Sequence, residues 1–168
     1  VEKFKPKKKR NLIDMIGALD ICVGGHTIGD AHCAAFRARL YNFSGTGQPD
    51  PTLSTEYLVQ LQSICPSTNP DPNTLTDFDL TTPDTFDNKY YTNLINNEGL
   101  LQSDQELYST DSSVNGATDA IALVKTYSAN NNAFLHAFAR SMINMGNISP
   151  LTGNEGEIRL NCRKVNNS

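Results

Sequence analysis

A histidine flanked by glycines stands near the start of the chain, in the segment Gly24-Gly25-His26-Thr27-Ile28-Gly29. Glycines on both sides of a histidine let the backbone come close to a flat or bulky group, because no side chain intervenes. An imidazole placed in this way can serve as a metal ligand or a general base. It can also be an ordinary histidine that is hydrogen-bonded within a helical turn, and these six residues leave both interpretations open.

A second candidate site is the segment 77–87, which holds four aspartates and three threonines. Four of its residues could direct oxygen atoms at one hard cation: Asp79, Thr82, Asp87 and, through its carbonyl, Thr85. Ca²⁺ suits such a set, because it binds roughly six to eight oxygens at variable geometry. The spacing is not that of an EF-hand, and a polar loop without a metal is the alternative interpretation.

A third candidate is Asp104, in the segment Ser103-Asp104-Gln105-Glu106. Ser103 and Glu106 have the spacing of a capping box, which predicts a helix start. Asp104 would then lie in the first turn, where the helix dipole stabilises its negative charge. The carboxylate is either a capping charge or a group that orients an imidazole from behind.

The four cysteines are Cys22, Cys33, Cys65 and Cys162. No CxxC pair occurs, which speaks against a zinc knuckle and against thioredoxin-like chemistry. Three glycosylation sequons begin at Asn42, Asn147 and Asn166. Together with the even number of cysteines, they favour a secreted protein in an oxidising environment.

Helical periodicity dominates the segments that must position these residues. It predicts helices over residues 31–41, 54–64, 88–96, 118–127 and 133–145. In the last of these, Phe134, Phe138, Met142 and Met145 form one apolar stripe. Asn131 or Asn132 is the expected N-cap of that helix, and Gly146 its end.

Strand signals are weak, since no segment alternates apolar and polar residues over any length. Between the predicted helices lie two turn-rich stretches, 42–51 and 66–83, and the second contains four prolines. Loops of this length in a compact domain are usually functional or pinned, here by a disulfide or a metal ion. The predicted fold class is therefore mainly α, with long Pro-rich loops and little β structure.

The chain has 168 residues, which suits one domain, and a net charge of −4. Its first ten residues hold six of the fourteen basic residues; from residue 11 onward, 8 basic residues accompany 17 acidic ones. An acidic body excludes a whole-chain nucleic-acid binder, and no apolar run reaches the roughly 20 residues of a membrane span. The basic head is expected to be a solvated, disordered tail; a polyanion-binding or nuclear-localisation segment is the alternative.

The pieces together resemble the secretory (class III) plant haem peroxidases. The resemblance covers about residues 23–166 and rests on several long motifs in the same order: His26-Thr27-Ile28-Gly29, Arg39-Leu40-Tyr41-Asn42-Phe43, Asp77-Phe78-Asp79, Asp87-Asn88-Lys89-Tyr90-Tyr91, Gly99 to Leu107 and Met145-Gly146-Asn147-Ile148. Residues 1–16 match poorly and form a divergent basic leader. Residues 17–168 are expected to be the proximal helical domain of the haem peroxidase fold, with the distal domain missing.

The resemblance implies roles for individual residues. His26 is similar to the proximal ligand of haem b, and Asp104 to the carboxylate that accepts its other N–H, which gives the imidazole imidazolate character. Phe78 is expected against the His26 ring, and His32 near a haem propionate. His136 has no such match and is expected at the surface or the edge of the core.

The resemblance also implies a Ca²⁺ site and a disulfide. The proximal Ca²⁺ ligands would be Thr27, Asp79, Thr82, Thr85 and Asp87. Cys33–Cys65 would be a structural bond that closes a loop of about 32 residues, worth roughly 3.5–4 kcal/mol in the chain-entropy model. The family partner of Cys162 belongs to the N-terminal half, so Cys162 is expected to be unpaired unless Cys22 replaces that partner.

The function implied is reduction of H₂O₂ at ferric haem, coupled to oxidation of small phenolic donors. Peroxide heterolysis needs a general base and a cation on the far side of the haem, which the family supplies from its N-terminal half. No signal peptide is visible, so either maturation removed it or the chain is a fragment. We therefore expect a secreted or vacuolar monomer that, alone, binds haem weakly and turns over poorly.

Two other functions compete with this one. The first is a non-catalytic, Ca²⁺-braced or glycosylated binding module derived from the same fold. The second is a zinc protein that uses His26, His32 and Cys33, although their spacing suits one tetrahedral site poorly and would leave Asp104 without a role.

Overall fold

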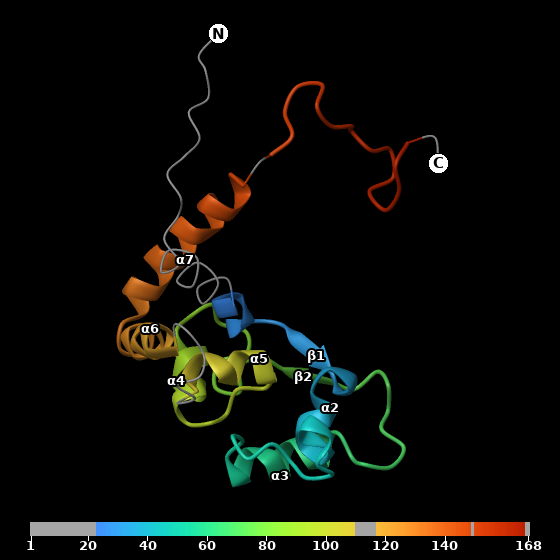
Figure 1. Ribbon diagram of the computed structural model, residues 1–168, viewed down its shortest axis with the longest axis vertical. Coiled ribbons are helices and arrows are strands. Elements are labelled where there is room, and N and C mark those ends of the chain that lie inside the picture. Colours follow the sequence, from blue (N-terminus) through green and yellow to red (C-terminus); the bar gives the residue numbers. More distant parts are fainter. Residues whose placement is uncertain (1–22, 110–116, 149, 167–168) are drawn as a thin grey trace.

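The computed structural model describes residues 23–109, 117–148 and 150–166 (Figure 1). Within these ranges the chain forms six α-helices and one small sheet, as the fold-class prediction requires. The helices are α2 (Cys33–Tyr41), α3 (Thr55–Ile64), α4 (Lys89–Ile95), α5 (Gln102–Gln105), α6 (Ala117–Ala129) and α7 (Asn131–Gly146). The predicted leader over 1–16 lies outside the described residues, and the domain boundary that follows it stays a prediction.

Short elements connect these helices. They are the 3₁₀ turns η1 (Gly24–Thr27), η2 (Phe43–Gly45) and η3 (Glu106–Tyr108) and the strands β1 (Asp30–His32) and β2 (Leu75–Asp77). The strands pair antiparallel, with Asp30 opposite Asp77 and His32 opposite Leu75. Three residues are too few to show alternation, which is why the sequence placed Ala31 in a helix instead of β1.

Two helices begin at polar side chains that cap their free N–H groups. Ser54 Oγ accepts a hydrogen bond of 3.3 Å from Tyr57 N at the start of α3, which confirms the predicted start. Asn130 Oδ1 accepts one of 3.0 Å from Ala133 N at the start of α7. The predicted cap at Asn131 or Asn132 was therefore wrong by one or two residues, because several asparagines in a row offer the same side chain.

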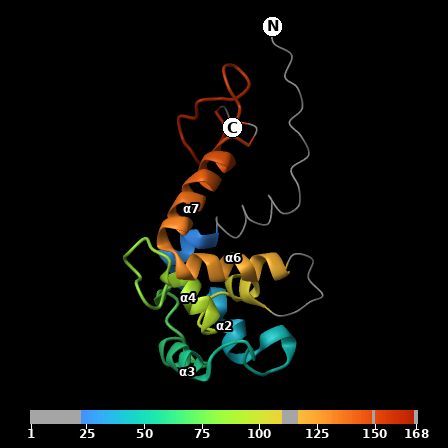
Figure 2. The ribbon, with the colours of Figure 1, turned by 90° about the vertical axis from the view of Figure 1, so that its left-hand side faces the viewer.

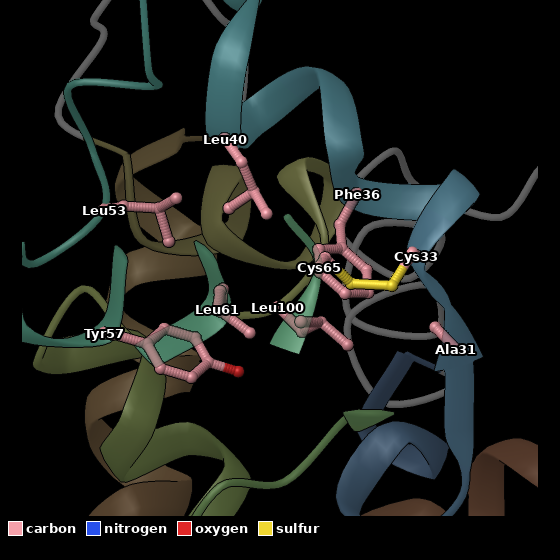
Figure 3. Packing of buried hydrophobic residues seen from close by; sticks show 9 residues of the cluster. All are labelled: Ala31, Cys33, Phe36, Leu40, Leu53, Tyr57, Leu61, Cys65 and Leu100. Atoms are coloured by element: carbon pink, nitrogen blue, oxygen red, sulfur yellow. A yellow bond between two sulfur atoms is a disulfide. The ribbon is translucent and has the colours of Figure 1, made fainter. Parts of the chain in front are cut away.

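The first of two apolar clusters lies between α2 and α3 (Figure 3). Its buried members are Ala31, Cys33, Phe36, Leu40, Leu53, Tyr57, Leu61, Cys65 and Leu100. The Cys33–Cys65 disulfide runs along one side and joins the first residue of α2 to the residue after α3. Leu100 brings the segment before α5 into the same cluster, so this segment is packed against α2.

The second cluster joins α4, α6 and α7. Its buried members are Tyr90, Tyr91, Leu94, Val124, Tyr127 and Phe134. Aromatic rings dominate: the Tyr91 ring lies 5.3 Å from Tyr127 and 5.2 Å from Phe134, between ring centroids. Such tilted contacts add to the area burial of each ring. Helix α4, which contributes to this cluster, also packs against η1, so the cluster supports the turn that carries His26.

The apolar stripe predicted for α7 is only half buried. Phe134 is fully buried, whereas Met142 is 39% exposed and Met145 46% exposed. In both orientations the C-terminal end of α7 points away from α4 and α6, and the residues after it continue in that direction (Figures 1 and 2). None of the helices in the described ranges is long and apolar enough to cross a membrane.

Candidate functional site

The imidazole of His26 is hydrogen-bonded to a buried carboxylate. His26 lies in η1 and Asp104 in the first turn of α5, 78 residues later. The Nδ1 atom lies 3.0 Å from Oδ2 and 3.2 Å from Oδ1 of Asp104. The Asp104 side chain is fully buried, while that of His26 is 34% exposed. A carboxylate on Nδ1 favours the tautomer in which Nδ1 carries the proton and the other ring nitrogen, Nε2, keeps its lone pair.

The electrostatic effect of this contact follows from the two groups. The hydrogen bond to Asp104 raises the pKa of His26 above its ordinary value; burial works in the opposite direction, and the negative charge of Asp104 adds to the rise. The carboxylate therefore makes the ring a stronger base. A stronger base is also a stronger electron donor to a metal.

Aromatic contacts fix the plane of the His26 ring. The Phe78 ring stacks on it, with 4.3 Å between centroids and 14° between planes. Tyr90 meets it edge-on at 6.5 Å. Phe78 is held in turn by its backbone N–H, which donates to the Gly29 carbonyl at 2.9 Å. Gly29 has a φ of +95°, a conformation that residues with a side chain rarely adopt. The backbone conformation therefore explains why a glycine stands at position 29.

Close packing explains why a glycine stands at position 24, before His26. A Cβ atom there would meet the Tyr91 hydroxyl and come within 2.8 Å of the Phe134 ring. From the sequence, we predicted that the glycines let the backbone approach a flat or bulky group. The bulky groups here are aromatic side chains of α4 and α7, which press directly against η1.

The helix that carries Asp104 begins differently from the prediction. Its N-cap is Leu101, and no side chain caps it. The capping box of Ser103 and Glu106 is therefore wrong. Ser103 Oγ instead donates to the Asp104 carboxylate at 3.3 Å, and Glu106 accepts a hydrogen bond of 2.8 Å from Gln102.

An oxygen-rich cluster lies directly beside His26 and gathers all five predicted Ca²⁺ ligands. They are Thr27, Asp79, Thr82, Thr85 and Asp87. Thr27 Oγ1 lies 3.3 Å from Asp79 Oδ2, 3.4 Å from the Thr85 carbonyl and 2.8 Å from the Asp87 carbonyl. Thr82 Oγ1 lies 3.0 Å from Asp87 Oδ1. Thr27 and Asp79 are fully buried.

One oxygen of Asp79 is already fully used by N–H donors. Its Oδ1 atom accepts hydrogen bonds from the backbone of Thr81 and Thr82 and from the side chain of Asn93, at 2.8 to 3.1 Å. The other oxygen, Oδ2, faces the hydroxyl groups of Thr27 and Thr82. Asn93 was not among the predicted site residues, because an isolated asparagine on a helix gives no signal in the sequence.

The oxygen cluster differs from a transition-metal site. Within the described ranges, no three His, Cys, Asp or Glu side chains gather as they would around such an ion. Hydroxyl, carbonyl and carboxylate oxygens together are the donors of a hard cation such as Ca²⁺. The zinc hypothesis is wrong for a separate reason: Cys33 is bonded to Cys65, so it has no thiolate to offer.

The remaining predicted residues lie at the surface. His32 is exposed at the end of β1, and His136 is exposed on α7. Asn42 and Asn147 are exposed, and Asn166 is half-buried; the sequon residues Ser149 and Ser168 lie outside the described residues. Their roles stay predictions.

Of the two remaining cysteines, Cys162 and Cys22, the structure describes only Cys162. Cys162 is exposed and free among the described residues. Cys22 lies outside them, so the proposed pairing of these two cysteines stays a prediction.

Comparison with known proteins shows which family the chain belongs to. The sequence profile of the family described as Peroxidase matches residues 16–130, more than half of the chain. The chain belongs to the peroxidase family. It is 58% identical over 143 residues to Peroxidase 15 of Ipomoea batatas and 53% identical over 143 residues to Peroxidase 22 of Arabidopsis thaliana. Peroxidase 37 of Arabidopsis thaliana is 49% identical over 166 residues.

These relatives are considerably longer than the chain. The alignments cover 85%, 85% and 99% of this peroxidase chain, but 42%, 39% and 46% of the three relatives. The resemblance to class III plant peroxidases is therefore confirmed, and the chain spans less than half the length of the curated relatives it matches. The family membership does not favour the alternative of a non-catalytic module.

Proposed function

We propose that this chain provides the proximal haem-ligand half of a secreted plant peroxidase, which reduces H₂O₂ and oxidises small phenolic donors. The observation that carries the proposal is the bond between His26 Nδ1 and the buried Asp104 carboxylate. That bond leaves Nε2 as the available donor on a ring that is partly exposed. The donor set fits haem b, since a neutral imidazole backed by a carboxylate is a strong axial ligand for iron.

Bound haem would supply the redox-active iron for peroxide reduction. The chain's own residues would hold that iron: His26 as ligand, Asp104 as acceptor of the Nδ1 proton and Phe78 as the ring that fixes the imidazole plane. His32, exposed at the end of β1, is proposed to pair with a propionate. The residues also fit Ca²⁺, through the oxygen atoms of the cluster around Thr27.

Peroxide cleavage needs more than this half contains. The base and the cation that act on the peroxide belong, by family resemblance, to a region of the relatives that this chain does not match. Of the three histidines in the sequence, the one outside the predicted haem site is His136, exposed on α7. We therefore expect the 168-residue chain to bind haem weakly and to turn over slowly.

Haemin titration of the 168-residue chain, followed by Soret absorbance, tests the proposal. His26→Ala should abolish the band of a histidine-ligated ferric haem, whereas the matched variant His136→Ala should retain it. Equal spectra for His26→Ala and the unsubstituted chain would contradict the ligand assignment. Failure of the unsubstituted chain to bind haemin, with the fold intact by circular dichroism, would instead favour the non-catalytic Ca²⁺-braced module.

A secreted location is part of the same proposal. The Cys33–Cys65 disulfide supports it, because such bonds persist in oxidising compartments. The sequons at Asn42, Asn147 and Asn166 support it as well. Glycosylation at these sites is proposed from the sequons themselves, and a monomeric state from the resemblance.

A further inference from the structure

Arg39 on α2 is a buried cation with partners in two loops. Its side chain is 3% exposed. The Nε atom donates to Asp50 Oδ2 at 2.7 Å, and a second nitrogen donates to Thr52 Oγ1 at 3.3 Å. The third nitrogen donates to two backbone carbonyls, of Gly99 at 2.6 Å and of Leu100 at 2.8 Å. The guanidinium fork thus joins the loop after η2 to the segment immediately before α5.

That segment leads directly to the carboxylate of the site. Leu101 is the N-cap of α5, and Asp104 follows three residues later. An isolated helix shorter than roughly 12 residues is marginal in water, and α5 has four residues and no side-chain cap. The position of Asp104 must therefore come from contacts with the rest of the molecule.

The same segment is held at a second point by Gln105. Gln105 Oε1 accepts a hydrogen bond of 3.1 Å from Gly99 N, and its Nε2 atom donates to the Leu94 carbonyl at 2.9 Å. Gly99 is thus fixed through its N–H by Gln105 and through its carbonyl by Arg39. A Cβ atom at Gly99 would come within 2.7 Å of the Leu94 side chain, so the backbone also fits tightly here.

The other end of this connection leads back to the histidine. α2 begins seven residues after His26, and its first residue is bonded to Cys65. Phe36, which lies on α2, and Leu100, which lies just before α5, belong to the same apolar cluster (Figure 3). Helix α2 therefore links the segment that follows His26 to the segment that precedes Asp104, and Arg39 makes the polar contact with the latter.

We propose that Arg39 is a positioning residue: by binding the Gly99 and Leu100 carbonyls, it holds the start of α5 so that the Asp104 carboxylate stays on His26 Nδ1. Asp50 supports it by fixing the guanidinium through Nε. This link from Arg39 to Asp104 and His26 is made by the chain's own residues and does not require bound haem. Its consequence for a haem iron rests on the proposed function.

The substitution Arg39→Lys tests this connection. It keeps the charge beside Asp50 and loses the planar fork that reaches the two carbonyls. Arg37→Lys is the matched control: Arg37 lies on the same helix and also donates to two backbone carbonyls, of Pro66 and Ser67, but these lie in the loop after the disulfide. Both variants are made in the 168-residue chain.

The measurement is the tautomer of His26, read from ¹⁵N chemical shifts at about pH 9, where an ordinary histidine is neutral. The unsubstituted chain and Arg37→Lys should hold the proton almost entirely on Nδ1. Arg39→Lys should raise the Nε2–H population at least threefold. An unchanged tautomer in Arg39→Lys would overturn the proposal, and so would equal changes in the Arg37 and Arg39 variants, which would indicate a general loosening of α2.

A second variant covers the case in which Arg39→Lys does not fold. Asp50→Asn keeps the shape of a residue whose side-chain partners are Arg39 and Thr52, both outside the segment from Gly99 to Asp104. Loss of the counter-charge should loosen the guanidinium and shift the His26 tautomer in the same direction. A folded Asp50→Asn chain with the tautomer of the unsubstituted chain would overturn the proposal.

The tautomer is read without haem, so this test and the haemin titration can fail independently. If haemin binds, the reduction potential of the iron provides another reading. A weaker Asp104 contact lessens the electron donation by His26, so the potential should rise in Arg39→Lys and stay unchanged in Arg37→Lys.

Discussion

Thr27 Oγ1 lies 2.8 Å from the carbonyl oxygen of Asp87, sixty residues later in the chain, and Thr27 is the covalent neighbour of His26. The oxygen cluster and the His26–Asp104 pair are therefore two sides of one turn, η1. An ion bound by the oxygens would brace the backbone of the histidine directly. Stability, cation binding and the position of the imidazole are expected to respond together.

Calcium should stabilise the chain through Thr27. At a Ca²⁺ concentration of about 100 times Kd, the free energy of unfolding should rise by about 2.7 kcal/mol, because the ion binds the folded state alone. Thr27→Val keeps the shape and removes the hydroxyl oxygen, so most of this gain should vanish. Thermal unfolding with and without a chelator measures it. Thr126→Val, which removes an exposed hydroxyl on α6, should keep the gain, and a melt insensitive to Ca²⁺ in the unsubstituted chain would contradict the site.

Removal of the Asp104 carboxylate should weaken haem binding. Asp104→Ala leaves His26 without the group that orients its ring, and loss of such a partner typically costs about 10- to 100-fold in affinity. Haemin titration measures the change. The control is Glu106→Ala, which removes an exposed acid two residues later whose partner is Gln102. Comparable affinities for the two variants would show that the carboxylate at position 104 has no special role.

The Arg39–Asp50 pair should make stability depend on pH in the acid range. Burial alone would raise the pKa of Asp50, but hydrogen bonds from Thr52 and Arg39 outweigh it and hold that pKa below its ordinary value. A carboxyl group whose pKa is lower in the folded state stabilises the fold above its unfolded pKa. This contribution is lost as the pH falls through the folded pKa.

The variant Asp50→Asn isolates that contribution. Near pH 7 its free energy of unfolding should be about 3 kcal/mol lower than that of the unsubstituted chain, since the Arg39 charge stays buried without its counter-charge. Below about pH 4, where an aspartate in the unfolded chain takes up a proton, the difference should shrink, and it should be lost as the pH falls through the lower pKa of folded Asp50. Urea unfolding over this range measures both chains. A difference that is constant with pH would mean that the ionised carboxylate is not what stabilises the fold.

Glycine at position 24 should be required for packing. In Gly24→Ala the added methyl group would meet the Tyr91 hydroxyl and the Phe134 ring, and overpacking of this kind costs about 1–3 kcal/mol. Chemical unfolding measures the loss. Gly146→Ala is the control, since nothing lies within 4 Å of a Cβ atom there, and it should change stability by less than about 0.5 kcal/mol. Equal effects of the two substitutions would contradict the close approach at η1.

Most of the longer helices could be predicted from the sequence alone. Apolar spacing located α3, α4, α6 and α7, because neighbouring turns of one helix bring residues i and i+4 together whatever surrounds them. The density of aspartate and threonine in 77–87 indicated the oxygen cluster, because most of its oxygen atoms come from residues close together in the chain. Motifs in a fixed order marked the family, and the profile match agrees with them.

How distant segments of the chain meet could be learned only from the folded structure. The contact between His26 and Asp104 depends on packing across 78 residues, and neither residue's neighbours in sequence define its distance. In the sequence, Arg39 was only the first residue of one motif; its burial depends on backbone carbonyls that a later loop brings to it. The exposed end of α7 shows the reverse case, since an apolar stripe specifies a face to be covered but not what covers it. Periodicity records local geometry, whereas burial and long-range hydrogen bonds arise only when separate elements pack.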